Sequence, residues 1–420
     1  TLSVGGIIKA VYSSSNGLEK RPKLRFPGFD ESYRTTPLGE IASLVNRTDP
    51  KSNAPIMMLS AGNGFIMQSE KYSRDNAGQS LKKYILLKQG ELAYNHGASK
   101  AKQFGCCYEL TEPEARIPYV YHCFKINDHE YTPFIAMALN NAKMDKQLKR
   151  LVSSSVRMDG LLNISFEDYM SVTLHLPSST EQKHIADFLK KIDERIAAQE
   201  KLLASLKKYK RGLLRTVFSE KGSHSLLHDA VSHRIDEVCD VLSGKRIPKG
   251  ETFSPRPTEY RYITVSDMGE KYISSDTLQF ITSHTEKQIT RYKVRNGDII
   301  ISVAGTLGKL NIITPDLDGV NLTENCDRFT NFRGINPEYL YHVLSSDLIQ
   351  SQIEASKTKN GQPKLALERI RNFVVPVPHQ IRQEQFVGVM NSIDKYIASQ
   401  QAVLDRCCKA RAGLLQQLFI

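Results

Sequence analysis

The chain contains an internal repeat with a period of about 200 residues, and this feature limits its possible folds more than any other. Residues 172–218 align without a gap with residues 373–419. The matched positions include Pro177 and Pro378, Gln182 and Gln383, Ile192-Asp193 and Ile393-Asp394, Gln199 and Gln400, Leu203 and Leu404, and Gly212-Leu213-Leu214 and Gly413-Leu414-Leu415. A period this long exceeds the unit of a solenoid and predicts two copies of a whole domain with an appended segment.

A weaker match upstream of these segments keeps the same order in both halves. Residues 38–41 (LGEI) resemble residues 235–238 (IDEV), and residues 87–95 (LKQGELAYN) resemble residues 294–302 (VRNGDIIIS). The second match is a predicted strand preceded by a Gly-acid turn. We therefore expect a first domain at residues 21–177, a repeated helix at 178–219, a second domain at 226–378 and a second repeated helix at 379–420.

The repeated segment has the spacing of a coiled-coil helix. Apolar residues recur at alternating steps of four and three in both copies, which is typical of a seam. We expect the two helices to pair antiparallel with pseudo-two-fold symmetry, which would bring the polar seam residues Gln199 and Gln400 close together. The alternative is that each seam packs only against its own domain. The residues predicted to form the helix-pair and partner interface are Ile185, Leu189, Ile192, Ile196, Gln199, Leu203, Ile393, Ile397, Gln400 and Leu404.

The two copies differ where the repeated helix begins. In the first copy Ser178 lies three residues before Glu181, which is the spacing of a capping box. In the second copy Arg382 stands at the position of Glu181. We therefore expect a capping box in the first helix only.

The two domains mix short β-rich runs with helical ones, which favours an α+β fold. Residues 260–265 (YRYITV) and 298–303 (DIIISV) are predicted strands. Residues 337–356 are predicted to form one amphipathic helix with Pro337 in its first turn. Residues 1–20 lack the pattern of a signal peptide, and we expect a disordered lead-in or a remnant foreign to the fold.

The net charge of +12 and the isoelectric point near 9.2 favour a polyanionic partner, of which nucleic acid is the commonest. In each domain, loops at matching repeat positions are rich in side chains that contact phosphates and base edges. An ordinary solvated loop is the alternative for each. The candidate DNA-binding residues are Asn95, His96, Ser99, Lys100, Lys102, Ser155, Arg157, Lys245, Arg246, Lys249, Thr306, Lys309, Lys357, Lys359, Asn360, Gln362 and Lys364.

The sequence contains no recognisable catalytic or metal-binding motif. Residues 305–309 (GTLGK) lack the upstream glycine and the Ser or Thr of a phosphate loop. Residues 336–339 (NPEY) resemble the N-P-P-Y motif of adenine methyltransferases, but they open a predicted helix and no glycine-rich cofactor loop precedes them. The seven cysteines show no zinc spacing and suit a reducing cytoplasm. We expect no catalytic residue and no metal in this chain.

Several short motifs are spread along the chain. They are residues 22–30 (PKLRFPGFD), 38–41 (LGEI) and 89–95 (QGELAYN), the P-x-x-x-E-Q helix start at 177–182 and the GLL-x-x-x-F helix end at 212–218. Together these motifs resemble the specificity (S) subunits of type I restriction-modification systems. The resemblance covers essentially the whole chain from Pro22 onward. It implies two target-recognition domains in tandem, each followed by a long helix.

The resemblance also implies a function without catalysis. Each recognition domain would read one half of a bipartite site in double-stranded DNA, and the helix pair would set the unread spacer and dock two methyltransferase subunits. Two restriction subunits would complete a cytoplasmic complex, without a membrane. S-adenosylmethionine, ATP and magnesium would bind the partner subunits, and no cofactor would bind this chain. A coiled-coil adaptor without sequence recognition, or a self-contained DNA methyltransferase or nuclease, are the alternatives.

Overall fold

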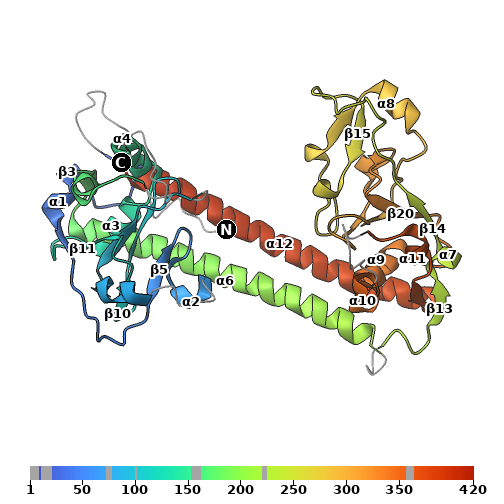
Figure 1. The fold of residues 1–420 in the computed structure, drawn as a ribbon, viewed down its shortest axis with the longest axis horizontal. Helices are drawn as coiled ribbons and strands as arrows, with labels where there is room; N and C mark the ends of the chain where they lie inside the picture. Colours follow the sequence, from blue (N-terminus) through green and yellow to red (C-terminus); the bar gives the residue numbers. More distant parts are fainter. Residues whose placement is uncertain are drawn as a thin grey trace. The chain divides into compact units, whose positions relative to one another are not determined.

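The computed structural model describes residues 9–10, 21–71, 78–99, 102–152, 162–219, 225–355 and 364–420. The chain forms two compact units, which we call unit 1 (Thr1–Glu200 and Ala402–Ile420) and unit 2 (Lys201–Gln401) (Figure 1). Each repeated helix is therefore shared between the two units. The predicted lead-in falls largely outside the described residues, although strand β1 (Lys9–Ala10) pairs with strand β2 (Leu24–Arg25).

Unit 1 contains a four-stranded antiparallel sheet in the order β4-β11-β8-β9. Its strands are β4 (Ala42–Leu44), β11 (His122–Ile126), β8 (Leu92–Asn95) and β9 (Cys106–Glu109). Besides β1 with β2, three strand pairs accompany the sheet: β3 (Arg34–Pro37) with β12 (Thr173–Leu176), β5 (Met57–Ser60) with β6 (Gly64–Met67), and β7 (Ile85–Lys88) with β10 (Glu114–Ile117). The helices are α1 (Leu38–Ile41), α2 (Gln68–Lys71), η2 (Gly78–Lys83), α3 (Thr132–Ala138), α4 (Ala142–Leu151) and α5 (Phe166–Met170).

Unit 2 contains the corresponding sheet in the order β14-β20-β17-β18. Its strands are β14 (Asp240–Ser243), β20 (Cys326–Thr330), β17 (Ile299–Ser302) and β18 (Leu310–Ile312). A second sheet has the order β16 (Gln279–Ile281), β15 (Tyr260–Ile263), β19 (Asn321–Leu322), and β13 (Val231–Arg234) pairs with β21 (Val374–Val377). The helices are α7 (Ile235–Val238), η3 (Val265–Asp267), η4 (Ser275–Thr277), α8 (Ser283–Gln288), η5 (Pro315–Leu317), α9 (Pro337–Ser345), α10 (Asp347–Ala355) and α11 (Leu367–Arg371).

The four-stranded sheets of the two units have the same topology, which confirms the tandem α+β fold expected from the sequence. In each unit an early strand pairs with the strand just before the long helix, β3 with β12 and β13 with β21. The backbone N–H of Leu38 donates to the carbonyl of Val172 at 2.8 Å, and that of Ile235 donates to the carbonyl of Phe373 at 3.0 Å. Each domain is thus closed at the point where its helix leaves.

The predicted strands at 260–265 and 298–303 are confirmed as β15 and β17. The prediction of one helix over residues 337–356 is wrong, because α9 ends at Ser345 and α10 begins at Asp347. Ser346 between them is extended, with ψ at 160°, and its hydroxyl donates to the carbonyl of Val343 at 2.6 Å. A serine that bonds the backbone in this way competes with the helix, which explains the break.

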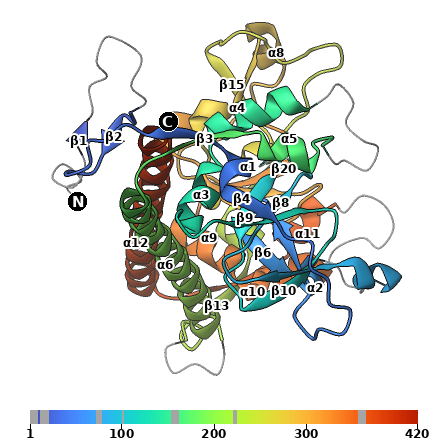
Figure 2. The same ribbon diagram turned by 90° about the vertical axis from the view of Figure 1, so that its left-hand side faces the viewer.

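The repeated helices are α6 (Ser179–Val217) and α12 (Gln380–Leu418), each 39 residues long. Within each unit they lie side by side (Figures 1 and 2). In unit 1 the carboxylate of Asp193 on α6 bonds the guanidinium of Arg411 on α12, and in unit 2 Lys210 on α6 bonds Asp394 on α12. Early positions of one helix thus meet late positions of the other, which confirms the antiparallel pairing.

The predicted seam residues occupy the covered face of the two helices. Ile185, Leu189, Gln199 and Leu203 are buried, and the other six, Ile192, Ile196, Ile393, Ile397, Gln400 and Leu404, are half-buried. Ile185 and Leu189 belong to the core of unit 1 together with Leu414 and Leu418 of α12. The seams therefore pack against a domain at their ends as well as against each other. The expected proximity of Gln199 and Gln400, which belong to different units, stays a prediction.

The repeated glutamine near each helix start joins that helix to its domain. Gln182 is fully buried, and its side-chain oxygen accepts from the backbone N–H of Tyr131, which precedes α3, at 2.9 Å. Gln383 is 1% exposed and accepts from the backbone N–H of Asn336, which precedes α9, at 2.7 Å. Each amide also donates to the carbonyl of the repeated proline, at 3.0 and 2.9 Å. Because both the oxygen and the nitrogen of this buried amide are hydrogen-bonded, the amide holds the start of the helix in one orientation on the domain.

The repeated phenylalanine at each helix end lies in the domain of the other repeat. Phe419, after α12, stacks on Phe134 of the first domain with ring centroids 4.9 Å apart. Phe218, after α6, contacts Tyr339 and Phe386 edge to face at 6.1 and 5.6 Å. Both phenylalanines are less than 9% exposed. The GLL-x-x-x-F motif therefore closes each unit with the helix that starts in the other one.

The capping box expected at Ser178 and Glu181 is only half present. The backbone N–H of Glu181 donates to the hydroxyl of Ser178 at 3.4 Å. The Glu181 carboxylate instead accepts from Nε and Nη2 of Arg25 at 2.8 and 2.7 Å, and both side chains are buried. In unit 2 the charges are exchanged, since Arg382 at the matching position pairs with Asp229. Both repeats therefore form an ion pair between the helix start and the segment at the start of the domain, with the acidic and basic partners exchanged in unit 2.

Candidate nucleic-acid interface

In unit 2 the predicted DNA-contacting loop 304–309 follows the central strand β17. The hydroxyl of Ser302, the last residue of that strand, accepts from the backbone N–H of Lys309 at 2.9 Å and donates to the carbonyl of Thr306 at 2.5 Å. Gly305 and Gly308 have φ near +75°, which side-chain-bearing residues rarely adopt. This turn leaves Thr306 exposed and Lys309 half-buried.

The segment that follows α10 meets the same loop. Ala304 forms a β-bridge with Lys364, and the backbone N–H of Leu365 donates to the carbonyl of Val303 at 2.9 Å. Lys364 is exposed beside the loop that carries Thr306 and Lys309. The structure therefore brings two separately predicted loops to one edge of the sheet. The other candidates of this segment, Lys357, Lys359, Asn360 and Gln362, lie outside the described residues.

Unit 1 builds the corresponding edge with the same backbone contact. The N–H of Leu162 donates to the carbonyl of His96 at 2.9 Å, as Leu365 does to Val303 in unit 2. The side-chain oxygen of Asn95 accepts from the N–H of Gly97 at 2.9 Å, and the hydroxyl of Ser99 accepts from the N–H of Lys102 at 3.1 Å. Candidates Lys100, Ser155 and Arg157 fall outside the described part of the chain.

Not every candidate side chain of unit 1 is free to meet DNA. His96 is 7% exposed, and the ammonium of Lys102 donates to the carbonyl of Asn140 at 2.8 Å. Asn95 is half-buried and Ser99 is exposed. The candidate residues of unit 1, which were predicted on the same grounds, therefore differ in how accessible their side chains are to DNA.

Below this edge, unit 1 contains an aromatic cluster that the sequence did not reveal. Tyr94 and Tyr169 are stacked with centroids 3.8 Å apart, and the rings of His96 and His122 lie 4.9 Å apart. Burial lowers the pKa of His122, whose Nε2 lies 2.9 Å from the carbonyl of Ile164. Stacked rings give a rigid base to the loop above them. Their residues come from three distant segments, so no local pattern predicts the cluster.

The third candidate loop, residues 243–250, turns where β14 ends. A Cβ on Gly244 would lie 2.0 Å from the carbonyl oxygen of Thr323, so only glycine fits this close approach. Lys245 lies over the ring of Tyr292 at 5.8 Å, and Nε of Arg246 lies 2.5 Å from the carboxylate of Glu324. Lys245, Arg246 and Lys249 are all exposed.

A buried carboxylate lies near the described basic residues of unit 2. Asp327 on β20 is 2% exposed, and burial raises its pKa to about 6, against the opposing effects of Ser243, Arg371 and Lys364. Asp298, the residue before β17, forms an ion pair with Arg328 of β20 at 3.2 Å. These two carboxylates are therefore covered, while Lys364 is exposed.

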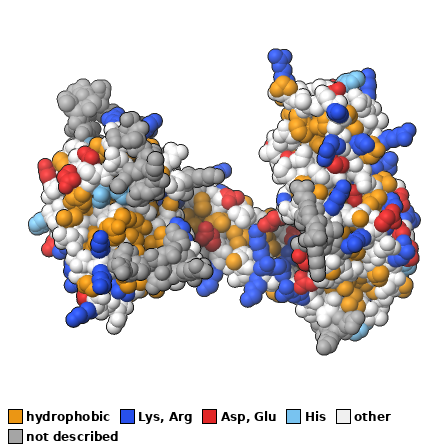
Figure 3. Space-filling view, in the orientation of Figure 1, with side chains coloured by type: hydrophobic (Ala, Val, Ile, Leu, Met, Phe, Trp, Pro, Cys, Tyr) orange, Lys and Arg blue, Asp and Glu red, His pale blue; other side chains and the backbone are white. Residues whose placement is uncertain are grey.

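Lys and Arg side chains lie on the visible face of both units, among acidic and apolar ones (Figure 3). Among the described residues, no group of three or more His, Cys, Asp and Glu side chains is placed to hold a metal ion. All seven cysteines are described and free. In the same part of the chain, no helix combines the length and apolar character that a membrane span requires.

The chain is thus a duplicated protein, with two α+β domains that carry equivalent loops and share an antiparallel helix pair. A family model described as the type I restriction modification DNA specificity domain matches residues 82–208 and 228–406. The chain therefore belongs to this family. Membership identifies it as a specificity subunit that recognises DNA sequence.

Known relatives agree with this assignment. The chain is 22% identical over 289 residues to the type I restriction enzyme MjaVIII specificity subunit of Methanocaldococcus jannaschii, and the match covers 65% of this chain and 67% of that protein. It is 24% identical over 283 residues to the type I restriction enzyme EcoBI specificity subunit of Escherichia coli, covering 58% of this chain and 57% of that protein. These matches thus span between about half and two thirds of the relatives' lengths.

Solved structures share the fold. The S subunit of the type I restriction-modification system from M. genitalium has a TM-score of 0.56 at 16% identity, over 95% of this chain and 99% of that one. A chain from a structural study of assembly and conformational transition in the type I R-M system has a TM-score of 0.58 at 16% identity, over 93% and 98%. At this identity the likeness concerns the fold alone.

Proposed function

We propose that this chain reads a bipartite DNA site, with one half-site read by each unit, and that the helix pair fixes the length of the unread spacer. The observation that carries the proposal is the repeated edge described above. In both units the loop after β8 or β17 is held to the segment after α4 or α10 by an equivalent backbone hydrogen bond. The same candidate surface thus occurs twice in one chain, which supports a site in two parts.

The proposed partners are double-stranded DNA, two methyltransferase subunits and two restriction subunits. Support for docking on the helices comes from large apolar side chains that α6 and α12 expose in unit 2. They are Leu202, Tyr209, Ile381, Val389 and Tyr396, which are 38–62% exposed. Exposed apolar side chains gathered on a surface are a feature of protein-binding sites.

The chemistry of the complex is assigned to the partners. We propose that S-adenosylmethionine binds the methyltransferase subunits and that ATP and magnesium bind the restriction subunits, so that this chain is non-catalytic and works in the cytoplasm. The absence of catalytic motifs from the sequence supports this division.

The test is to co-express the chain with a type I methyltransferase subunit from the same source and to map methylated adenines across the host genome. We expect one two-part motif with a fixed gap, and no such motif when the methyltransferase subunit is expressed alone. A stable complex that methylates without a two-part motif would refute the proposal.

A further inference from the structure

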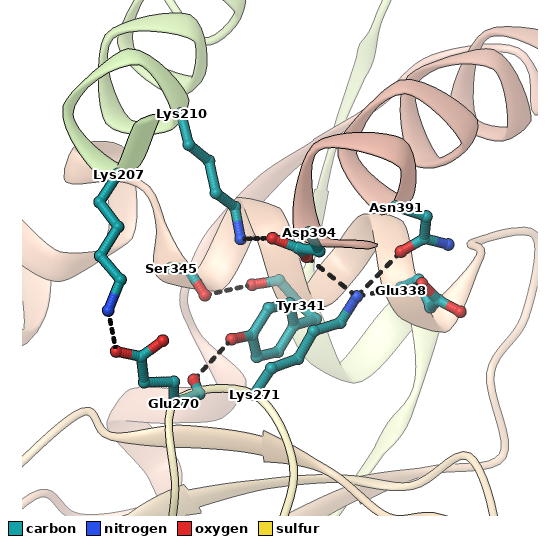
Figure 4. Close-up of polar contacts among 9 residues, drawn as sticks. All are labelled: Lys207, Lys210, Glu270, Lys271, Glu338, Tyr341, Ser345, Asn391 and Asp394. Atoms are coloured by element: carbon teal, nitrogen blue, oxygen red, sulfur yellow. Dashed lines mark hydrogen bonds and ion pairs between the residues drawn. The ribbon is translucent and has the colours of Figure 1, made fainter. Parts of the chain in front are cut away.

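A short loop of the second recognition domain, residues 268–272, reaches the helix pair of unit 2 (Figure 4). Gly269 makes the turn possible, because a Cβ there would lie 2.3 Å from the carbonyl oxygen of Tyr272. The carbonyl of Lys271 accepts from the N–H of Ile312 on β18 at 2.9 Å, and the carbonyl of Glu270 accepts from the hydroxyl of Tyr341 on α9 at 3.0 Å. The loop is therefore fixed to the domain on two sides.

The ammonium of Lys271 is the centre of this contact. It donates to the side-chain oxygen of Asn391 at 2.9 Å and lies 3.4 Å from the carboxylates of Asp394 and Glu338. It also lies 5.3 and 5.7 Å from the ring centroids of Tyr272 and Tyr341. The Lys271 side chain is only 11% exposed. One nearly buried cation thus ties the loop to α12 and α9 at once.

Lys271 is held in its charged form. Burial alone would lower its pKa, but the neighbouring Tyr272, Glu338 and Asp394 raise it by more, so the net shift is upward. Removing Lys271 would leave Glu338 and Asn391 without this cation, while Asp394 would keep its ion pair with Lys210.

The same network includes the other long helix. Asp394, which contacts Lys271, also bonds Lys210 of α6, and Lys207 of α6 bonds the carboxylate of Glu270 at 2.8 Å (Figure 4). The Lys207 pair is more exposed, at 43% and 83%, and contributes less. The loop therefore contacts both helices at the ion pair that joins them in unit 2.

The first repeat does not conserve the acceptors for such a lysine. The position of Asn391 is taken by Lys190, whose charge would repel a second ammonium. If the two helix starts are matched at Tyr131 and Asn336, whose N–H groups donate to the repeated glutamines, the position of Glu338 is taken by the uncharged Pro133. Both oxygens of Asp193, the counterpart of Asp394, accept from Arg411 of the helix pair itself. The lysine contact is a property of the second recognition domain.

The loop is mechanically connected to the candidate DNA surface. Strand β18, which holds the carbonyl of Lys271, directly follows the loop 304–309 that carries Thr306 and Lys309. Gly269, Glu270, Gly308 and Lys309 line a single hollow of about 690 Å³. Movement of residues 268–272 relative to the helices would therefore move the candidate DNA-binding loop.

We propose that Lys271 is a positioning residue, which locks the second recognition domain to its helix pair and so restricts the spacer lengths that the protein accepts. This inference rests on the proposed function, because a spacer exists only if the site has two parts. Without the lysine contact the domain keeps its fold and its loops but is less strictly oriented on the helices. Half-sites that are one base pair too close or too far then become acceptable.

The experiment measures the dissociation constants of the complex with methyltransferase subunits for three duplexes, which carry the natural spacer or a spacer one base pair shorter or longer. We expect the wild type to prefer the natural spacer by at least about tenfold, which is about 1.4 kcal/mol. Lys271→Met should reduce this preference about fivefold or more, mainly by improved binding to the altered spacers, and Lys271→Arg should restore most of it. Lys395→Met removes a similar exposed charge one residue beyond Asp394 and should leave the preference unchanged.

Equal weakening of all three duplexes by Lys271→Met, or an unchanged preference, would overturn the inference and assign Lys271 a purely structural role. If Lys271→Met does not fold, Asn391→Ala removes the 2.9 Å acceptor while keeping both carboxylates, and it should shift the preference in the same direction. A wild-type complex without any spacer preference would instead contradict the proposed function itself. The two failures are therefore distinguishable.

Discussion

Arg411 near the end of α12 donates from Nε and Nη2 to the two carboxylate oxygens of Asp193 on α6. The second repeat forms the same contact with its members on the opposite helices, Lys210 on α6 and Asp394 on α12. The repeated isoleucine-aspartate pair and the repeated basic interruption of the seam are therefore partners of each other. Two such pairs fix the register of an antiparallel helix pair, because a shift of either helix separates both.

Exchange of the charges tests this register in unit 1. Asp193→Arg alone should place two cations together and lower the free energy of unfolding by about 1 kcal/mol, since both side chains are more than one third exposed. The double variant Asp193→Arg with Arg411→Asp should recover most of the loss. Urea unfolding of the two single variants, the double variant and the wild type measures the coupling. No recovery in the double variant would mean that the pair does not set the register.

The two helix starts should respond very differently to loss of their charge. Glu181→Gln leaves Arg25 buried without its carboxylate and should cost about 3–5 kcal/mol of stability. Arg382→Gln breaks the exposed counterpart with Asp229 and should cost less than about 1 kcal/mol. Denaturant unfolding of both variants gives the comparison, and similar costs at the two sites would contradict the burial seen at Arg25 and Glu181.

The phenylalanine that follows α12 should stabilise a domain that is distant in sequence. Phe419→Ala removes the ring stacked on Phe134 and should destabilise unit 1 by about 3–5 kcal/mol. Amide hydrogen exchange should show the loss of protection in α3 and α4 of unit 1, while β15 and β17 of unit 2 stay protected. Val374→Ala, at a side chain 46% exposed, is the control and should have little effect. Loss of protection in unit 2 instead would be inconsistent with the docking of Phe419 in unit 1.

Only part of this structure can be predicted from the sequence. The repeat predicts both long helices, their antiparallel pairing and the α+β class, because the helical period and the similarity of the two halves can be read directly from the order of the residues. The repeat also shows that Gln182 and Phe218 have counterparts in the second half, but it does not predict their contacts. Their partners Tyr131 and Tyr339 are 51 and 121 residues away in the sequence. The sequence shows that Arg382 replaces the glutamate of the first repeat, but it does not explain why. The partner of Arg382, Asp229, lies in a segment that has no clear match in the first repeat.

The DNA-binding role of the candidate loops stays a prediction. Composition and repeat position identified the loops around Thr306 and Lys364, and the structure joins these two at one sheet edge. Composition could not distinguish the exposed Ser99 from Lys102, whose ammonium is bonded to a backbone carbonyl. Lys271 carries no sequence signal, because its acceptors come from α9 and α12 and only the fold brings them together.

A buried histidine in unit 2 should make stability depend on pH. His342 is fully buried, its ring nitrogens have no hydrogen-bond partner among the described residues, and burial together with Lys210 and Lys271 lowers its pKa to about 3. The unfolded chain, with an ordinary histidine pKa near 6.5, binds the proton more readily between pH 6.5 and 3. Stability should therefore fall as pH falls through this range, by up to about 5 kcal/mol for the full shift.

His342→Leu removes the group that must be protonated and should flatten this part of the stability profile. Thermal unfolding of the wild type and the variant between pH 7 and 4 measures the slopes. His284→Leu on α8, at an exposed histidine, is the control and should leave the wild-type slope. An equally steep loss in His342→Leu would show that other groups cause it.

The exposed basic residues of unit 2 should contribute to binding through phosphates. Lys249→Ala and Lys364→Ala should each weaken DNA binding and reduce the slope of log K against log salt by about 0.9 if the lysine neutralises one phosphate. Fluorescence anisotropy over a salt series measures both quantities. Lys51→Ala, in an exposed turn of unit 1 outside the candidate loops, should leave the slope unchanged. A wild-type slope in Lys364→Ala would remove Lys364 from the contact surface.

The central claim is that each unit reads its own half of the DNA site. The most direct test compares the methylation motif of the wild-type complex with that of a complex in which Thr306 and Lys309, in the loop of unit 2, are both replaced by alanine. The account predicts that base preference relaxes in one half of the motif, while the other half and the spacer stay the same. Equal changes in both halves, or an unaltered motif from a complex with altered DNA affinity, would contradict it.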